Sequence, residues 1–200
     1  MTWDMALALM GFAFVMSISP GPGNFLLLAS GANFGFARSL PLMLGISGGF
    51  LAMVFAIGLG LGQVFDRYPQ IYDVLRIVGA AYVAWMAWGL MQARGLGTAA
   101  GREIAQPIGF IQAALLQLVN PKAWAVALIV TVTYTVPQDF LTSLLLLIAL
   151  FAVVNLPALS VWVLSGAALR DVLAKGNRIA VFNIAMAVLL VASMVPVLLR

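Results

Sequence analysis

The sequence predicts an all-α membrane protein with six transmembrane helices arranged as a 3+3 inverted repeat, whose first and fourth spans are broken. Three observations support this: the composition, the lengths of the apolar runs and two proline breaks. Of the 200 residues, 64% are hydrophobic and 8% are charged, which is more apolar surface than a soluble domain could bury. We therefore expect one transmembrane domain over residues 1–200, with repeat halves of about 1–100 and 101–200.

Six apolar runs are long enough to cross a bilayer, whose core of about 30 Å requires about 20 apolar residues. The first run, Met5–Phe34, contains the first break. The other runs are Leu40–Gln63, Ile71–Leu90, Ile108–Val136, Leu141–Leu169 and Ile179–Leu199. Asp4 and the lack of Lys or Arg before the first run oppose a cleaved signal peptide. We therefore expect this run to remain as the first span.

The first break consists of Pro20, Gly21, Pro22, Gly23 and Asn24. Proline has no amide hydrogen and collides with the preceding helical turn, so one half-helix should end here and another begin at about Asn24. The start of a half-helix has unpaired N–H groups and a positive dipole, which favour an anionic group such as an amino-acid carboxylate. Asn24 could cap this half-helix or bind the ligand. The alternative is a kink that only shapes a helix.

The second break consists of Asn120, Pro121 and Lys122, with fourteen residues of the span before the lysine. A cation at mid-membrane is costly, so an ionisable residue at this depth indicates function. Lys122 could bind a carboxylate or, because burial disfavours its charge, exchange a proton. The alternative is a lysine that extends to the membrane surface.

Gln117, Asn120 and Trp124 have a spacing that would place them on one helix face near Lys122. Hydrogen bonding between helices could also explain Gln117 and Asn120. Asn155 and Asn183 are polar residues of the fifth and sixth spans that could line the pathway. The predicted substrate site comprises Pro20, Gly21, Pro22, Gly23, Asn24, Gln117, Asn120, Pro121 and Lys122.

Several classes of protein are disfavoured by what the sequence lacks. Without Cys or His, disulfides and the usual nucleophile–base pairs of enzymes are impossible, and a metal would have only carboxylates as ligands. The Asp and Glu residues lie at span ends or in loops, so we expect neither an enzyme nor a metal or cofactor site. The basic residues form no stripe, which opposes nucleic-acid binding, and no phosphate-binding GxxxxGK[ST] motif occurs.

The basic residues between the spans are unevenly distributed over the two sides of the membrane. One side receives Arg38, Arg94, Arg102, Arg170, Lys175 and Arg178, and the other receives Arg67, Arg76 and Arg200. The positive-inside rule places the richer side in the cytoplasm. Both termini are then expected outside.

Three segments resemble motifs of the lysine exporter/threonine efflux (LysE/RhtB) family of amino-acid translocators. Ser19–Leu28 resembles the first-span PGP signature, Gly79–Trp85 the third-span glycine–tyrosine motif and Gln117–Ala123 the fourth-span NPK motif. The size and span layout also match over the whole chain, and the resemblance is to the branch that exports cysteine, O-acetylserine and similar neutral metabolites.

The resemblance implies an exporter of the bacterial inner membrane that is driven by the proton gradient. We expect antiport by alternating access, in which the two halves rock around a central site made by the two broken spans. Its partners would be a small amino acid, protons and the lipid bilayer, and a homodimer is left open. The family role falls on Pro20, Gly21, Pro22, Asn24, Asn120, Pro121 and Lys122.

Two positions depart from the family pattern. Gly23 stands where many members have Asn, and Phe50 follows Gly49 where lysine-type members have an acidic residue. A cationic substrate would need a buried carboxylate as its partner, so we expect a small neutral amino acid or metabolite. The alternatives are an uncoupled small-solute channel or facilitator and a non-transporting scaffold subunit.

Overall fold

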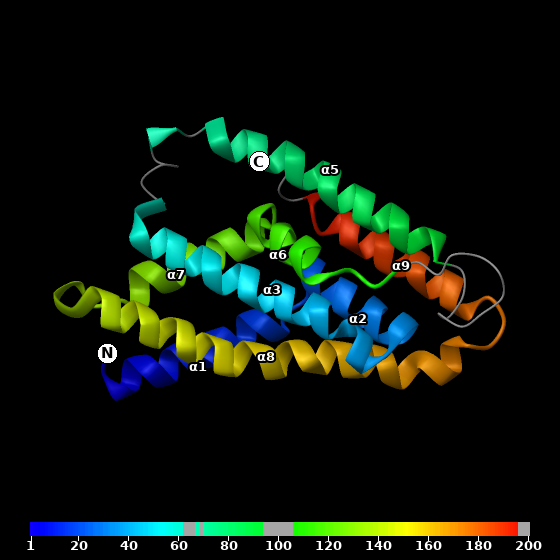
Figure 1. Cartoon of the computed structure of the whole chain (residues 1–200), viewed down its shortest axis with the longest axis horizontal. Coiled ribbons are helices and arrows are strands. Elements are labelled where there is room, and N and C mark those ends of the chain that lie inside the picture. Colours follow the sequence, from blue (N-terminus) through cyan, green and yellow to red (C-terminus); the bar gives the residue numbers. More distant parts are fainter. Residues whose placement is uncertain (62–66, 69, 94–105, 196–200) are drawn as a thin grey trace.

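The computed structural model describes residues 1–61, 67–68, 70–93 and 106–195 (Figure 1). Every regular element in these ranges is helical, which confirms the predicted all-α class. The α-helices are α1 (Trp3–Ile18), α2 (Pro22–Phe34), α3 (Phe36–Ala56), α5 (Gln70–Gln92), α6 (Phe110–Leu118), α7 (Pro121–Tyr134), α8 (Phe140–Leu173) and α9 (Arg178–Ala192). A π-helical turn, Ile57–Leu61, extends α3, and a 3-10 turn, Pro137–Asp139, precedes α8.

By length and composition, the described helices provide up to four of the six predicted spans. Two continuous helices, Phe36–Leu61 and Pro137–Leu173, are long and apolar enough to cross a membrane. Two bent pairs reach that length only together: α1 with α2, at 61°, and α6 with α7, at 71°. At the positions of the predicted third and sixth spans lie shorter apolar helices, Ile77–Gln92 and Arg178–Ala192, which do not reach that length. The predicted breaks in the first and fourth spans are therefore confirmed.

Both breaks arise from local backbone chemistry. After α1, Ser19 and Gly21 are extended, and Pro22 occupies the first turn of α2. Proline is tolerated there because the first amides of a helix have no helical partner, so α2 begins two residues before the expected Asn24. After α6, the side chain of Asn120 accepts a hydrogen bond from the amide of Lys122, and Pro121 starts α7.

Each half of the chain contributes one long helix that packs along the bent pair of the other half. The long helix α8 packs along both arms of the first bent pair, α1 and α2. Conversely, α3 of the first half packs along both arms of the second bent pair, α6 and α7, while α5 pairs with α9 (Figure 1). This exchange is expected of a 3+3 inverted repeat, which remains a prediction.

Glycines bring the backbones of these partners into direct contact. A Cβ atom at Gly31 of α2 would collide with the carbonyl oxygen of Val163 in α8, and one at Gly166 of α8 with that of Leu28 in α2. Gly45 in α3 approaches the carbonyl oxygen of Phe110 in α6 in the same way. Small residues at membrane helix contacts allow such close approach, which positions each broken span firmly against its partner.

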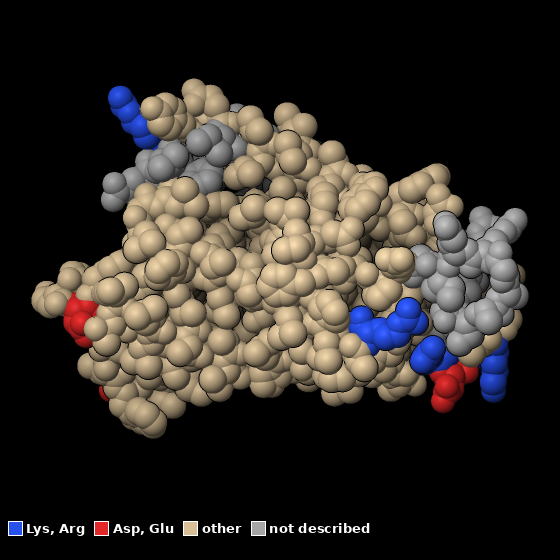
Figure 2. Space-filling view, in the orientation of Figure 1, with Lys and Arg blue, Asp and Glu red and all other residues tan. Residues whose placement is uncertain are grey.

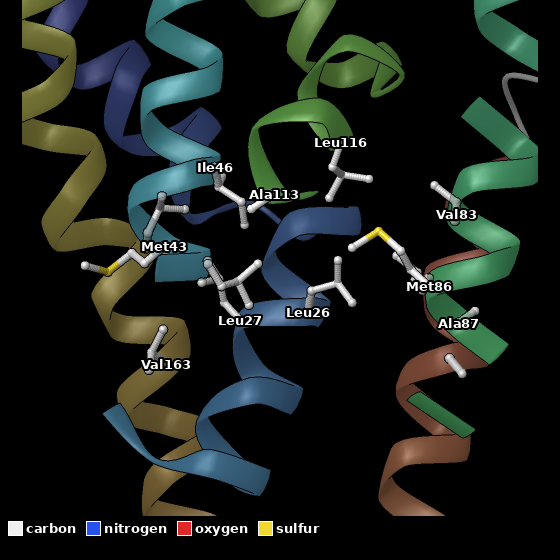
Figure 3. Close-up of a cluster of buried hydrophobic side chains, with 14 of the residues drawn as sticks. Leu26, Leu27, Met43, Ile46, Val83, Met86, Ala87, Ala113, Leu116 and Val163 are labelled. Atoms are coloured by element: carbon white, nitrogen blue, oxygen red, sulfur yellow. The ribbon is translucent and has the colours of Figure 1, made fainter. Parts of the chain in front are cut away.

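Buried apolar side chains fill the space between α5 and the broken spans. Val83 and Met86 of α5 lie opposite Leu26 of α2 and Leu116 of α6 (Figure 3). Outward-facing residues are also apolar: Val132 is 82% exposed and Trp88 is 62% exposed. An apolar exterior of this kind suits the hydrocarbon core of a lipid bilayer.

On the face shown in Figure 2, the visible charged side chains lie toward the two ends of the bundle, whereas Lys122 lies at the cavity inside it. Arg170, Lys175 and Arg178 flank the turn between α8 and α9, and Arg38 lies near the start of α3 at the same end (Figure 1). Arg94, Arg102, Arg200 and the side chain of Arg76 lie outside the described residues. The part of the basic side that is described therefore gathers at one end.

Candidate functional site

The two breaks meet at a cavity of about 60 Å³ inside the bundle. A water molecule needs about 10–15 Å³ by this measure, so the space could hold several waters or a small polar solute. The predicted residues that line it are Gly21, Pro22, Gly23, Asn24, Gln117, Asn120 and Lys122. Pro20 is exposed and does not line the cavity, and Pro121 begins α7 behind Lys122. These two prolines belong to the breaks but do not line the cavity.

Lys122 bridges the second break to the first. Its Nζ donates hydrogen bonds to the carbonyl oxygen of Ser19, at 2.7 Å, and to the Ser19 hydroxyl, at 2.8 Å. Ser19 ends α1, where the helix dipole is negative and favours a cation. A Cβ atom at Gly21 would lie 3.2 Å from Cδ of the lysine, so Gly21 provides room for this side chain. The ammonium thus lies between the two breaks, in contact with the residue that follows α1.

The start of α2 leaves backbone amides free. Among the residues that the structure describes, no side chain caps this helix, and the amides of Gly23 and Asn24 belong to the first turn, where a helix offers no partner. The side chain of Asn24 instead donates through Nδ2 to the carbonyl oxygens of Ser17, at 3.0 Å, and Ser19, at 2.7 Å. The idea that Asn24 caps α2 is therefore wrong, because its amide group satisfies the end of α1.

The second break has its own polar chain. Nδ2 of Asn120 donates to Oε1 of Gln117 at 3.4 Å, and Nε2 of Gln117 donates to the carbonyl oxygen of Ala113 at 3.5 Å. Trp124 donates its indole N–H to the carbonyl oxygen of Leu118 at 2.7 Å and does not line the cavity. The expected single face that included Trp124 is absent because the 71° bend separates α6 from α7.

Ser17 and Asn155 line the cavity without having been part of the predicted site. Nδ2 of Asn155, on α8, donates to Oγ of Ser17, on α1, at 2.9 Å. The amide in the fifth span was a visible signal for Asn155. A serine near the end of an apolar run gives no comparable signal for Ser17. The packing of α8 along α1 brings the two together.

The remaining walls of the cavity are apolar. Phe50 and Phe151 lie with ring centroids 4.7 Å apart, and both line the cavity. No Asp or Glu belongs to the lining, and no cluster of possible metal ligands occurs among the described residues. Within the described lining, Lys122 is thus the one charged side chain.

A second, larger cavity of about 260 Å³ lies between α2, α5 and the segment that leads into α6. Its lining includes Trp85, Trp88 and Asn33. No residue of the predicted site contributes to it, so the smaller cavity is the place where the two breaks act together.

A bundle with two broken spans that meet at a polar cavity defines a membrane translocator. The family model described as LysE type translocator matches residues 14–198, and the chain belongs to this family. Members are transporters and not enzymes, which confirms the expected absence of an enzyme function.

Curated relatives place the chain more narrowly. The cysteine/O-acetylserine efflux protein of Klebsiella pneumoniae is 30% identical over 174 residues, which cover 83% of this chain and 84% of that protein. The proteins of the same name from Salmonella typhi and Escherichia coli K12 are each 32% identical, over 141 and 143 residues, with 69% of both chains covered in each case. No solved structure matches. The resemblance to the cysteine and O-acetylserine branch is confirmed.

Proposed function

We propose that this protein exports a small neutral amino acid, of the type of cysteine or O-acetylserine, across the bacterial inner membrane. The observation that carries the proposal is the meeting of both broken spans at one cavity with a single cation and no carboxylate in its described lining. Discontinuous membrane helices are typical of transporter sites, because their ends supply polar groups at mid-membrane.

The carboxylate of the substrate binds between Lys122 and the start of α2. Two hydrogen bonds from the ammonium to Ser19 leave one of its three donors available. The amides of Gly23 and Asn24 offer further donors at the positive end of a helix dipole. A carboxylate here would gain charge-assisted hydrogen bonds, which are stronger than neutral ones.

The substrate is neutral overall because the described cavity lining contains no carboxylate that could pair with a cationic side chain of the substrate. An additional ammonium on the substrate side chain would need a carboxylate partner at this depth. The wall instead contains Phe50 and Phe151, and the polar groups opposite Lys122 are uncharged amides. A short side chain also suits a cavity of about 60 Å³.

Transport proceeds by alternating access, in which the halves move around the central cavity and expose it to each side in turn. Antiport with protons would use Lys122, since it is the one titratable group among the described lining residues. Release of its proton weakens the attraction for a carboxylate, which links substrate release to proton exchange.

Counterflow in proteoliposomes tests the proposal. Purified protein in vesicles loaded with an unlabelled amino acid should accumulate the same labelled amino acid, with cysteine, O-acetylserine, serine, alanine and lysine as the panel. We expect exchange of the small neutral members and not of lysine. Exchange of no amino acid would contradict the function and favour a scaffold subunit. Cysteine flux that is indifferent to an imposed pH gradient would favour an uncoupled facilitator.

The basic end of the bundle faces the cytoplasm in this proposal, with both termini outside. Arg170, Lys175 and Arg178 at that end support this orientation under the positive-inside rule. An epitope tag placed before Met1 should be accessible to antibody in intact spheroplasts. A tag that reacts only after lysis would reverse the orientation.

A further inference from the structure

Asn155, a residue of the central cavity lining, contains a buried hydrogen-bond acceptor that is unpaired among the described residues. The residue is 6% exposed and lines the cavity. Its Nδ2 donates to Oγ of Ser17, whereas its Oδ1 is buried and has no hydrogen-bond partner among the described residues. Buried polar atoms without partners are rare in folded proteins and require an explanation, and a ligand that supplies a donor is one.

The side chains of Asn155 and Lys122 are both held at the end of α1, by Ser17 in its last turn and by Ser19, which caps it. Ser17 holds the amide of Asn155, and Ser19 holds the ammonium of Lys122. The Cα atoms of residues two apart are separated by at most about 7 Å. An acceptor and a cation thus lie at the same end of α1, as the charged groups of one α-amino acid require.

We propose that Oδ1 of Asn155 accepts a hydrogen bond from the α-ammonium group of the substrate. This inference rests on the proposed function, in which Lys122 and the start of α2 bind the carboxylate. Oδ1 of Asn120 and Oε1 of Gln117 are less available, since they already accept from the amide of Lys122 and from Asn120. The two ends of the zwitterion are then bound by groups of opposite hydrogen-bonding character.

Ser17 is a positioning residue in this arrangement. By accepting from Nδ2, its hydroxyl orients the amide group of Asn155 and leaves Oδ1 for the substrate. Because Asn155 adds no net charge, it binds the α-ammonium without attracting a second cation on the substrate side chain.

The test compares cysteine with 3-mercaptopropionate, which has the same thiol and carboxylate but no amino group. Each compound competes against labelled cysteine in the counterflow assay under reducing conditions. Wild-type protein should prefer cysteine. In Asn155→Leu, the apparent affinity for cysteine should fall about ten- to a hundred-fold, the range for a lost hydrogen bond to a charged group. The affinity for 3-mercaptopropionate should not change, so the ratio of the apparent affinity for cysteine to that for 3-mercaptopropionate should approach one.

Three further variants keep this result interpretable. Asn155→Asp retains an acceptor and should retain the preference for cysteine. Ser17→Ala retains Asn155 but removes the hydroxyl that accepts from its Nδ2. This variant should reduce the preference for cysteine by a smaller factor. Asn33→Leu removes a buried amide outside this cavity and should leave the preference unchanged, even where it lowers stability.

An unchanged preference in Asn155→Leu would overturn the inference while leaving the proposed function intact. If that variant does not fold, an unchanged preference in Ser17→Ala would overturn it instead. Wild-type vesicles that exchange no amino acid would contradict the proposed function itself. If another amino acid than cysteine exchanges, the same comparison is made with that amino acid and its analogue without the amino group.

Discussion

The ammonium of Lys122 donates to both the carbonyl oxygen and the hydroxyl of Ser19, a residue 103 positions earlier in the chain. This contact joins the two broken spans. It also places the cation over the negative end of α1, which offsets part of its cost at mid-membrane. A substrate carboxylate would therefore meet an ammonium that is already oriented, and the following predictions test the consequences.

Lys122→Met should weaken substrate binding, because the carboxylate loses a charge-assisted hydrogen bond. We expect the KM for counterflow of cysteine to rise at least about tenfold. Lys175→Met is the matched control, since this lysine is exposed in the turn after α8, and its KM should equal that of wild type. Equal KM values for both variants would remove Lys122 from the binding site.

Leu159→Cys should react with a charged, water-soluble thiol reagent, and substrate should slow the reaction. Leu159 lines the central cavity, whereas Val161, on the same helix, is 50% exposed on the lipid-facing surface. Because the chain has no native cysteine, each variant carries one thiol. Val161→Cys should remain unreactive, since the charged reagent does not enter lipid. A Leu159→Cys variant that is as unreactive as Val161→Cys would mean that the cavity does not open to water.

Gly166→Ala should destabilise the bundle, because the new methyl group would collide with the carbonyl oxygen of Leu28. We expect a loss of about 1–3 kcal/mol, the usual cost of overpacking, seen as a lower Tm in detergent. Gly11→Ala is the control: no atom lies within 4 Å of the added carbon. It should leave Tm unchanged or raise it slightly, because alanine favours helix. A Tm for Gly166→Ala at the level of the control would show that α2 and α8 can separate without cost.

Asn33→Leu and Asn183→Leu should each cost about 1–2 kcal/mol, because each leaves the buried Oδ1 of the other asparagine without its donor, while the Nδ2 of that asparagine keeps a backbone acceptor. The two side chains exchange hydrogen bonds of 2.7 Å and 3.0 Å between α2 and α9. In the double variant the costs should sum to less than the two separate values, since the shared pair is lost only once. Denaturant unfolding of the four proteins measures this, and strict additivity would contradict the pairing.

The breaks could be predicted from the sequence because their causes are local. Pro22 and Pro121 disrupt the helical ladder wherever the helix lies, and Lys122 is conspicuous in any apolar run. The start of α2 was misplaced by two residues because proline is compatible with a first helical turn. The suggested capping role of Asn24 was wrong for a related reason: its partners, Ser17 and Ser19, depend on the 61° angle between α1 and α2.

The composition and hydropathy of this chain by themselves determined a helical membrane protein with two interrupted spans. The length of an apolar run and the effect of a proline are local properties, which do not depend on the neighbouring helices. The tertiary structure alone decided that Lys122 meets Ser19, that Gly31 and Gly166 bring α2 against α8, and that Asn155 retains an unpaired oxygen beside Ser17. Those contacts depend on which helices pack together and at what angle, and residues more than a hundred positions apart carry no local pattern that specifies this.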